Sequence, residues 1–503
     1  MEQALHNRIP RWEAIRNITG QPGISVGVIH QGREVLNYHA GVIDFDTNKK
    51  PNGDTLYCIA SLSKALMAAS IDMLVREGET SWDTPVHSII PEFRHTHKTA
   101  ELKGMTLRDI CSHRTGLLSL DEITQGLDGR ILIDKKEVVK VCNAMPVKHE
   151  LRSSFLYNNG LFELAGHVVE RLSGYSTWGV FQHERIYEPL GMNRTRAFRD
   201  DDEIDDNFAQ PYMILTDGTP SYIPSTELSV DSMNGGSGGV RSSLNDLLKW
   251  SRCLLASFDK ALPEMVASSG GLLHRLVPSS NSCQIGANFA KSNPHFPVLG
   301  AASPSLLVYG HQGDVPGNTC NIYIIPETNS AVVVLANGTG HSDATDWIAQ
   351  DIIQTISELK PEVDFLSVAK EASRLYLSHY TRDFRDPLER NRGAKSPLPP
   401  LGDFVGTYVM EDLDVVFICV SLVPNSGIMR MRINGHDDQA MVLNYYNDDV
   451  FSYLPDSYDE CLKRGLDRTH WSAFLIHFLR DEQGRVKGCR WELDGVDTLF
   501  TRK

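Results

Sequence analysis

The segment 61–79 constrains the fold of this chain more than any other. It reads SLSKALMAASIDMLVREGE, is rich in Ala, Leu and Met, and contains neither Gly nor Pro before Gly78. Such residues favour a helix, and because apolar side chains lie on almost all its sides, we expect the helix to be buried. The strand-like segment TLYCIA leads directly into it. The sequence therefore places Ser61 and Lys64 at the start of a helix in the protein interior.

Ser61 and Lys64 form a candidate nucleophile and base. Lys64 follows three residues after Ser61, on the same helical face, so its amine can reach the serine hydroxyl. A buried lysine loses its charge more readily, and a neutral amine can accept the serine proton, while the positive end of the helix dipole lies at the serine. The same Ser-x-x-Lys spacing recurs at 257–260 and 367–370, which we interpret as solvated helix faces. The preceding strand and the apolar helix favour Ser61.

Tyr157-Asn158-Asn159 is a second set of residues suited to the same chemistry. A tyrosine beside a cationic lysine can have its pKa lowered below the usual value of about 10, and can then transfer protons. The Asn159 amide can hold both the lysine and a substrate carbonyl. Asn-Asn-Gly is also strong turn chemistry, and both interpretations can hold because loops carry function.

His311-Gln312-Gly313, at the end of the strand-like run LLVYG, is a third set. A glycine there lets a substrate backbone approach the strand edge closely. The N–H of Asp314 can pair with that of Ser61 to form an oxyanion hole. A lone histidine near a strand end is often structural, so a structural and a functional role for His311 both stay open.

Ser237 is a rival nucleophile, because Gly-Gly-Ser-Gly-Gly at 235–239 matches the G-x-S-x-G turn of α/β-hydrolases. That turn needs a buried strand immediately before the serine, whereas the preceding SVDSMN is polar. Glycine on both sides is typical of a flexible loop. We therefore predict a loop at 234–239 and prefer Ser61 as the nucleophile.

The three sets, in this order, resemble the serine β-lactamase and penicillin-binding family, whose signature is Ser-x-x-Lys, a polar triplet and Lys-Thr-Gly. The Tyr-x-Asn and His-x-Gly versions are similar to those of the class C β-lactamase branch, with its esterases, D-aminopeptidases and fungal acyltransferases. Flanking phrases such as LRDICSHRTGL, SSFLYNNGLFELAGHVVERLSG and GHQGDVPGNTCNIYIIPE strengthen the resemblance, which covers about residues 20–360. The tail from about 400, beginning LGDFVGTYV, is similar to a small β-domain often attached to such enzymes.

The resemblance implies a role for each residue. Ser61 would be acylated, Lys64 and Tyr157 would share the base and acid work, and Asn159 would orient the lysine and the substrate. The implied substrate-binding residues are Asn159, His311, Gly313 and Asp314, and the oxyanion would be held by the N–H groups of Ser61 and Asp314. The mechanism needs no metal or organic cofactor, and the chain has no HExxH or paired Cys/His spacing.

One departure from the family pattern bears on the substrate. His311 takes the place of the lysine in Lys-Thr-Gly, which removes a permanent cation from the substrate's end of the site. A histidine near pH 7 is mostly neutral if its pKa stays near about 6.5. Because a permanent cation favours the carboxylate of a β-lactam, its loss favours neutral esters, thioesters or amides. We see no glutamate to assist deacylation, so the acceptor must use Tyr157 or Lys64.

The chain of 503 residues is too long for one ordinary core. We expect an α/β fold of the α+β type, with a β-lactamase/transpeptidase-like arrangement over residues 1–385. An antiparallel sheet would be flanked by helices and joined to a mostly helical lobe, with Ser61 in the cleft between them. Segment 386–400, rich in Pro, Arg and Asp, is expected to be a linker, and 401–503 a small β-barrel or sandwich.

Individual elements follow from the same patterns. Two strands are predicted around the turn Gln31-Gly32, within 24–43, and three more between 306 and 338, where short apolar runs alternate with Pro or Gly. The predicted helices, besides 61–79, cover 161–172, 243–255, 343–359 and 365–380.

Charge and cysteine usage bear on partners and compartment. With 64 acidic and 49 basic residues the formal net charge is −15, which disfavours nucleic acid and anionic membranes as partners and leaves a small-molecule substrate. The first twenty residues contain no apolar signal core, and the nine cysteines are scattered without CxxC spacing. We therefore expect reduced thiols in a cytoplasmic protein. Nothing in the sequence fixes the oligomeric state.

Two classes of function remain. The first is an enzyme that forms an acyl-Ser61 intermediate in intracellular, including natural-product, metabolism, either as a hydrolase or as an acyltransferase to an alcohol or amine. The second is a non-catalytic binding protein with the same fold, since function resides in sites and not in folds. The presence of Ser61, Lys64, Tyr157 and Asn159 together favours the enzyme.

Overall fold

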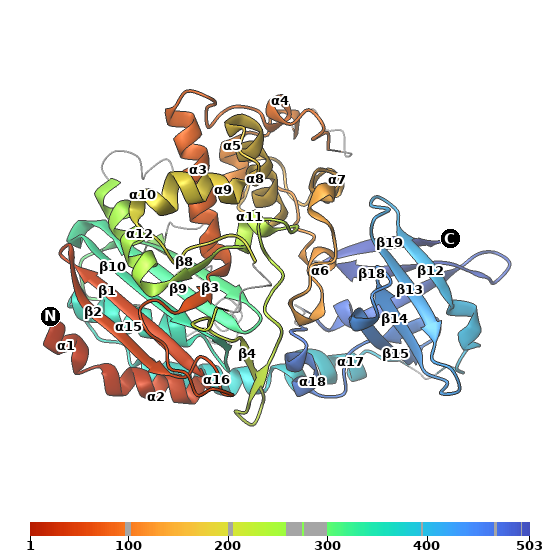
Figure 1. Cartoon of the computed structure of the whole chain (residues 1–503). Helices are drawn as coiled ribbons and strands as arrows, with labels where there is room; N and C mark the ends of the chain where they lie inside the picture. The colour runs from red at the N-terminus through yellow and green to blue at the C-terminus, as the bar shows by residue number, and fades with distance from the viewer. Residues whose placement is uncertain are drawn as a thin grey trace.

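The structure, a computed structural model, describes residues 1–95, 102–199, 205–257, 274–275, 299–393, 396–466, 470–493 and 495–503. At its centre is a six-stranded sheet in the order β2-β1-β10-β9-β8-β7, whose neighbouring strands are all antiparallel (Figure 1). The strands are β1 (Gly23–His30), β2 (Arg33–Gly41), β7 (His274–Arg275), β8 (Leu307–Val315), β9 (Asn318–Ile325) and β10 (Ser330–Ala336). The antiparallel sheet, its first hairpin and its three later strands are confirmed.

Helices cover both faces of this sheet because its central strand is apolar on both sides. All seven residues of β10 are buried, and they alternate between two apolar clusters. Val332 and Val334 share one cluster with residues of α1, α2, α15 and α16. Val333 and Leu335 belong to the other, with residues of α12 and the second lobe. These helices are α1 (Glu2–His6), α2 (Ile9–Thr19), α12 (Leu244–Ser257), α15 (Ala344–Ile356) and α16 (Phe365–Leu377).

The second lobe is mostly helical, as predicted, and stands above the sheet in Figure 1. Its two longest helices, α3 (Ser63–Arg76) and α8 (Gly160–Ser173), pack against each other. The shorter ones are α4 (Val86–Ile89), α5 (Leu107–Cys111), α6 (Asp121–Thr124), α7 (Val138–Ala144), α9 (Trp178–Gln182) and α10 (Glu188–Leu190). Two small sheets connect the lobes, formed by β3 (Leu56–Cys58) with β6 (Arg241–Ser243), and by β4 (Tyr212–Ile214) with β5 (Pro220–Tyr222) and β11 (Gly338–Thr339).

The segment 234–239 differs from the prediction of a flexible loop. It contains the short helix α11 (Gly235–Gly238), and its glycines are buried. A Cβ at Gly235 would lie 1.8 Å from the Ser229 carbonyl oxygen, and one at Gly236 would lie 2.5 Å from that of Phe162. Glycine is therefore required here by close packing and not by mobility.

The last part of the chain forms a closed barrel in which consecutive strands are neighbours (Figure 1). The strands are β12 (Gly406–Met410), β13 (Phe417–Leu422), β14 (Met429–Ile433), β15 (Ala440–Asn447), β16 (Val450–Ser452), β17 (Leu475–Arg480), β18 (Val486–Leu493) and β19 (Val496–Arg502). Aromatic side chains fill it, among them Phe404, Tyr408 and Trp491, all fully buried. Of the two predicted all-β arrangements the barrel is observed, and closure by pairing β12 with β19 leaves no sheet edge.

The segment 386–400, which we predicted to be a linker, begins with the helix α17 (Asp386–Arg390), and its described residues 386–393 and 396–400 contact the barrel at several points. Leu388 is buried, and its carbonyl accepts a hydrogen bond of 2.7 Å from the Tyr446 hydroxyl. Ser396 Oγ lies 2.6 Å from the Tyr445 hydroxyl. One buried leucine and several hydrogen bonds to the barrel thus anchor this charged segment. Within the described ranges, none of the helices has the length and apolar character needed to cross a membrane.

Candidate active site

A strained turn places Ser61 at the junction of the two lobes. Strand β3 ends at Cys58, and the chain enters a 3-10 turn over Ala60–Leu62 immediately before α3. Ala60 has a φ of 46°, in the left-handed region that disfavours residues with a Cβ. Such strain is typical of functional sites. Ser61 therefore precedes the long helix instead of lying in its first turn, and its side chain is not fully buried.

Lys64 lies beside Ser61, as its spacing predicts. Its Nζ is 3.0 Å from Ser61 Oγ and 2.9 Å from the carbonyl oxygen of Ser237. The side chain is completely buried, and burial lowers the pKa of Lys64 to about 7, although the nearby Asp121 carboxylate opposes this. Close to half of the molecules therefore carry a neutral amine at neutral pH. A neutral amine at this distance can accept the Ser61 proton.

Tyr157 donates a hydrogen bond of 2.9 Å to Ser61 Oγ, so the serine hydroxyl is held from two sides. Our expectation of a lowered tyrosine pKa is wrong. Burial raises the pKa of Tyr157 above its usual range, and the hydrogen bond to Ser61 opposes this only in part, while Asp121 adds to it. Removing a phenolate from water destabilises it by more than the hydrogen bond to Ser61 stabilises it. Tyr157 is thus a proton donor in the resting site.

Asn159 does not hold Lys64 as we expected. Its amide nitrogen donates a hydrogen bond of 2.8 Å to Asp121, the first residue of α6. Burial raises the pKa of Asp121, an effect that the Lys64 charge and the hydrogen bond from Asn159 oppose. Asp121 is therefore the acidic neighbour of Lys64, and sequence reasoning missed it because it lies in a connection with no pattern of its own.

His113 is a second residue that sequence reasoning missed. Its ring stacks on that of Tyr157 with centroids 4.3 Å apart, and its Nδ1 accepts a hydrogen bond from the Asn158 N–H at 3.1 Å. Burial, helped by the charges of Lys64 and His311, lowers its pKa well below the usual range. A neutral ring with an accepting Nδ1 supports Tyr157 without adding charge. No periodicity in the sequence marks this position.

Strand β8 contains the third predicted set, His311-Gln312-Gly313, and brings it to the site around Ser61. The His311 ring centroid is 6.4 Å from that of Tyr157, and His311 Nδ1 lies 2.6 Å from the carbonyl oxygen of Gln312. A Cβ at Gly313 would lie 2.3 Å from the carbonyl oxygen of Ile59. We expected Gly313 to admit a substrate backbone, but the group that comes close is the backbone leading to Ser61. The glycine thus lets β8 pack directly against the Ser61 turn.

Asp314 lies on the free edge of β8. Val315 pairs with Asn318 across a two-residue turn, so Asp314 and Thr319 form the next pair along the hairpin. Because hydrogen-bonded and non-hydrogen-bonded pairs alternate, the N–H of Asp314 points away from β9. The Asp314 side chain is exposed.

Ser237 is not placed as a nucleophile. No strand precedes it directly, and its hydroxyl donates a hydrogen bond of 2.7 Å to the Asn234 carbonyl. Its own carbonyl accepts from Lys64 instead. The glycine-rich segment therefore contributes a main-chain anchor for the base.

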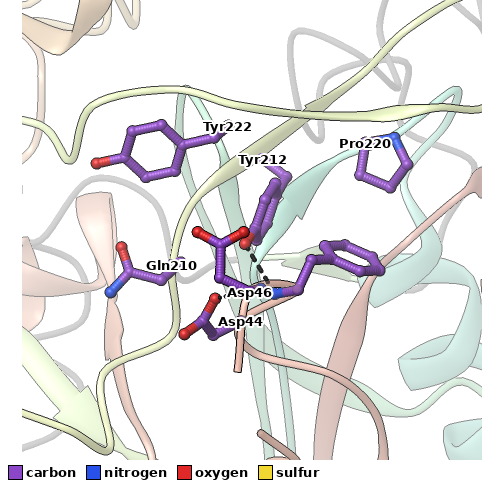
Figure 2. Close-up of a pocket in the computed structure, with 7 residues that line it drawn as sticks. Asp44, Asp46, Gln210, Tyr212, Pro220 and Tyr222 are labelled. Carbon is purple, nitrogen blue, oxygen red and sulfur yellow. Dashed lines mark hydrogen bonds between the residues drawn. The ribbon is translucent and has the colours of Figure 1, made fainter. Parts of the chain in front are cut away.

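A separate cavity of about 540 Å³ opens beside the β4–β5 hairpin. Its lining residues are Asp44, Phe45, Asp46, Gln210, Tyr212, Pro220 and Tyr222 (Figure 2). The Tyr212 hydroxyl accepts a hydrogen bond of 3.1 Å from the N–H of Phe45, which ties the cavity wall together. None of these residues belongs to the set around Ser61.

Comparison with known proteins agrees with this geometry. A family model described as Beta-lactamase matches residues 13–355. The chain belongs to the β-lactamase family. Its relatives include an unguisins hydrolase of Aspergillus violaceofuscus, 28% identical over 63% of this chain and 58% of the relative, so the match spans less than two thirds of that protein. An unguisins hydrolase of Aspergillus campestris is 25% identical over 77% of this chain and 72% of its own length.

Solved structures of the β-lactamase family share the fold. A class C β-lactamase from Rhodobacter sphaeroides is 20% identical, with a TM-score of 0.52, over 70% of this chain and 98% of that one. An octameric penicillin-binding protein homologue from Pyrococcus abyssi is 18% identical, with a TM-score of 0.53, over 99% of both chains. The family model spans the part of the chain that contains Ser61, Lys64 and Tyr157, and both fungal relatives are named as hydrolases.

Proposed function

We propose that the protein is a serine hydrolase that cleaves an ester, thioester or amide through an acyl-Ser61 intermediate. The observation that carries the proposal is the pair of hydrogen bonds at Ser61 Oγ, 3.0 Å from Lys64 Nζ and 2.9 Å from the Tyr157 hydroxyl. A binding protein has no need for a serine held between a lysine of lowered pKa and a protonated tyrosine.

Acylation begins when Ser61 Oγ attacks the substrate carbonyl carbon and its proton passes to the neutral Lys64 amine. The carbonyl π electrons move to the oxygen, and we assign the N–H groups of Ser61 and Asp314 to that oxyanion. When the C–O, C–S or C–N bond breaks, the leaving group takes the proton of the Lys64 ammonium, either directly or through the Tyr157 hydroxyl, which gives one proton to the leaving group and receives one from Lys64. The proton lost by Ser61 is thus returned to the leaving group, and charge is balanced.

Deacylation uses the same groups in reverse. A water molecule loses a proton to Lys64 as it attacks the acyl carbon, and Ser61 Oγ recovers a proton as it departs. Asp121 attracts the Lys64 ammonium in both half-reactions, which keeps the proton on the lysine until it is needed. A separate glutamate is not required for this cycle.

The surroundings of Ser61 favour an uncharged, apolar acyl group. His311 stands where the family signature has a lysine, so a permanent cation for a substrate carboxylate is absent from that position. Phe155 is 55% exposed, and its ring centroid lies 6.4 Å from that of Tyr157, which offers an apolar surface beside the nucleophile. Two relatives are named unguisins hydrolases, so we propose an unguisin as the first natural product to test.

The test is the intact mass of the protein after incubation with p-nitrophenyl butyrate. We expect the wild type to gain one butyryl group on the Ser61 peptide, and Ser61→Ala to gain none. Ser237→Ala is the matched control, because it removes the rival hydroxyl but keeps the carbonyl that holds Lys64, and it should still form the adduct. An adduct on Ser237, or p-nitrophenol release that survives Ser61→Ala, would contradict the proposal.

A second step separates hydrolysis from acyl transfer. Adding an alcohol or an amine to the acylated protein should leave butyrate as the main product if water is the natural acceptor. Formation of the butyryl ester or amide in place of butyrate would instead identify an acyltransferase.

A further inference from the structure

The geometry points to a catalytic function for the C-terminal barrel: its residue Gln439 is a positioning residue that holds the loop carrying Asp121 against Lys64. This inference rests on the proposed acyl-Ser61 chemistry. We call residues 121–132 the Asp121 loop. They comprise α6 and the residues that follow it towards α7, and lie between the helical lobe and the barrel (Figure 1).

The Asp121 loop is a compact unit held together by its own main-chain hydrogen bonds. The Gly126 N–H donates to the carbonyl of Arg130 at 2.8 Å, and the Leu132 N–H donates to that of Thr124 at 2.9 Å. On the side of the active site, Asn234 Nδ2 donates to Thr124 Oγ1 at 3.0 Å. Asn159 binds Asp121 on the same side, as described above. One hydrogen-bonded unit therefore links the Asp121 carboxylate at one end to Leu127 at the other.

Gln439 holds that far end. It lies in a short 3-10 turn (Asp437–Gln439) between β14 and β15, and its side chain is fully buried. Its Oε1 accepts a hydrogen bond of 2.7 Å from the Leu127 N–H, and its Nε2 donates to the Leu127 carbonyl at 3.2 Å. A Cβ at Gly126 would lie 2.3 Å from Gln439 Oε1, so the loop is shaped to admit this side chain. One barrel residue thus satisfies both main-chain groups of Leu127.

Other barrel residues fix the same loop at both flanks. The Asp128 N–H donates to the carbonyl of Arg464 at 2.9 Å. Asn434 Nδ2 donates to the carbonyl of Leu132 at 2.9 Å. On the surface, Arg130 forms an ion pair of 2.7 Å with Asp438. The loop is bound to the barrel along most of its length.

The chemical consequence lies in the charge of Asp121. Its carboxylate favours the charged form of Lys64, and this attraction weakens as the distance between the two groups grows. Tyr157, His113 and His311 are the other titratable groups around the lysine, and they lie on elements that Gln439 does not touch. Loosening the Asp121 loop should therefore lower the proton affinity of Lys64, as removing the carboxylate itself does.

The experiment compares Gln439→Leu, Asp121→Asn and the double variant in the full-length protein. The readout is the rate of acylation by p-nitrophenyl butyrate between pH 5 and 9. In both single variants we expect the rate at pH 6, divided by the plateau rate at high pH, to rise by about two- to threefold, because the midpoint moves to lower pH. The double variant should show no further rise than Asp121→Asn alone, since both changes act through one carboxylate.

Two controls keep the inference falsifiable. Asp414→Asn removes the barrel's ion pair with Lys140, which lies outside the Asp121 loop, and should leave the profile unchanged. Should Gln439→Leu not fold, Asn434→Ala should shift the profile in the same direction by less. It removes the contact at Leu132 and, within the barrel, the hydrogen bond that Asn434 Oδ1 accepts from the Phe417 N–H. A folded Gln439→Leu with a wild-type profile, or a double variant with additive shifts, would overturn the inference.

Hydrogen exchange of the Asp121 loop separates this inference from the proposed function. We expect residues 121–132 to lose protection in Gln439→Leu and not in Asp414→Asn, whether or not the protein acylates. No acyl-Ser61 in the wild type would end the proposed function while the exchange still reports on the loop. Unchanged exchange in Gln439→Leu would end the inference while the acyl-enzyme stands.

Discussion

Burial determines which neighbour of Ser61 acts as the base and which acts as the acid. The same loss of water lowers the pKa of Lys64 and raises that of Tyr157, because in each case burial destabilises the charged form of the side chain. The lysine becomes a base at neutral pH and the tyrosine stays an acid. The interior position of the two side chains therefore sets their roles without a third catalytic group.

The first prediction concerns the pH dependence of acylation. Lys64 must be neutral to accept the Ser61 proton, and its pKa is about 7. The acylation rate should therefore rise with pH, with a midpoint near 7, and reach a plateau above. Lys64→Arg keeps a cation that does not deprotonate, and should lower the rate at least about 100-fold at every pH. Stopped-flow release of p-nitrophenol measures both, and a flat profile from pH 5 to 9 would contradict the assignment of Lys64 as base.

Among single residues, the sequence predicts those that are joined to the site by a helical spacing. It misses those that only the tertiary fold brings to the site. Ser61 and Lys64 are linked by one helical turn, so their contact follows from their spacing. Asp121 and His113 reach the site through irregular connections, and neither lies in a periodic pattern. The predicted direction of the Tyr157 pKa shift was wrong, because the sequence indicates which groups are neighbours but not how deeply they are buried.

Helix α11 shows how an element can serve the site through its main chain. Glu163 on α8 is fully buried and accepts a hydrogen bond from the N–H of Gly236, while the carbonyl of Ser237 holds Lys64. Burial raises the pKa of Glu163 to about 8, although Lys135 and Gly236 oppose it. At neutral pH helix α11, which anchors Lys64, thus packs against Glu163 in its mostly protonated form.

The second prediction follows from Glu163. Its folded-state pKa is raised, so its contribution to stability is full at low pH and is lost as pH rises through about 8. Glu163→Gln copies the protonated acid at every pH. The free energy of unfolding of the wild type, relative to this variant, should therefore fall by about 4 kcal/mol between pH 5 and 9, since about three pH units lie between pH 5 and the folded-state pKa. Urea unfolding at several pH values measures it, and a difference that is constant with pH would show that Glu163 is ionised in the folded protein.

The third prediction concerns the packing of β8 on the Ser61 turn. Gly313→Ala would place a methyl group 2.3 Å from the Ile59 carbonyl oxygen, so β8 or the turn must move. We expect a loss of about 1–3 kcal/mol in unfolding free energy and a large drop in acylation rate. Gly402→Ala is the control, because a Cβ there has no described atom within 4 Å, and it should be nearly neutral. Equal effects of the two substitutions would rule out this close packing as the reason for Gly313.

The sheet and the long helices could be predicted because their residues repeat with a period. The α11 segment could not, since glycine is common both in mobile loops and where backbones touch, and only the three-dimensional contacts distinguish the two. The segment 386–400 shows the same limit. Its charged composition is typical of a linker, yet the buried Leu388 and several hydrogen bonds hold it against the barrel.

The β-lactamase-like part of the chain and the C-terminal barrel share one of the apolar clusters. A single apolar cluster runs from Ile29 in the sheet, through Leu132 and Ile133 beside the Asp121 loop, to Phe404 and Phe500 in the barrel. The fourth prediction is therefore that the full chain unfolds in one calorimetric transition, with a calorimetric to van't Hoff enthalpy ratio near one. Two resolved transitions would mean that the barrel and the sheet are independent in stability.

The pairing of β1 with β10 also sets the order of events while the chain is being made. Ile24 lies opposite Ala336, so the first hairpin emerges from the ribosome long before the strand that covers it. At about 5–20 residues per second this interval is roughly 15–60 s. During that time Ile24, Val26 and Val28, all fully buried in the finished protein, are paired with β2 on one edge but lack β10 on the other. A chaperone that binds extended apolar segments is therefore expected to meet the nascent chain first at this hairpin.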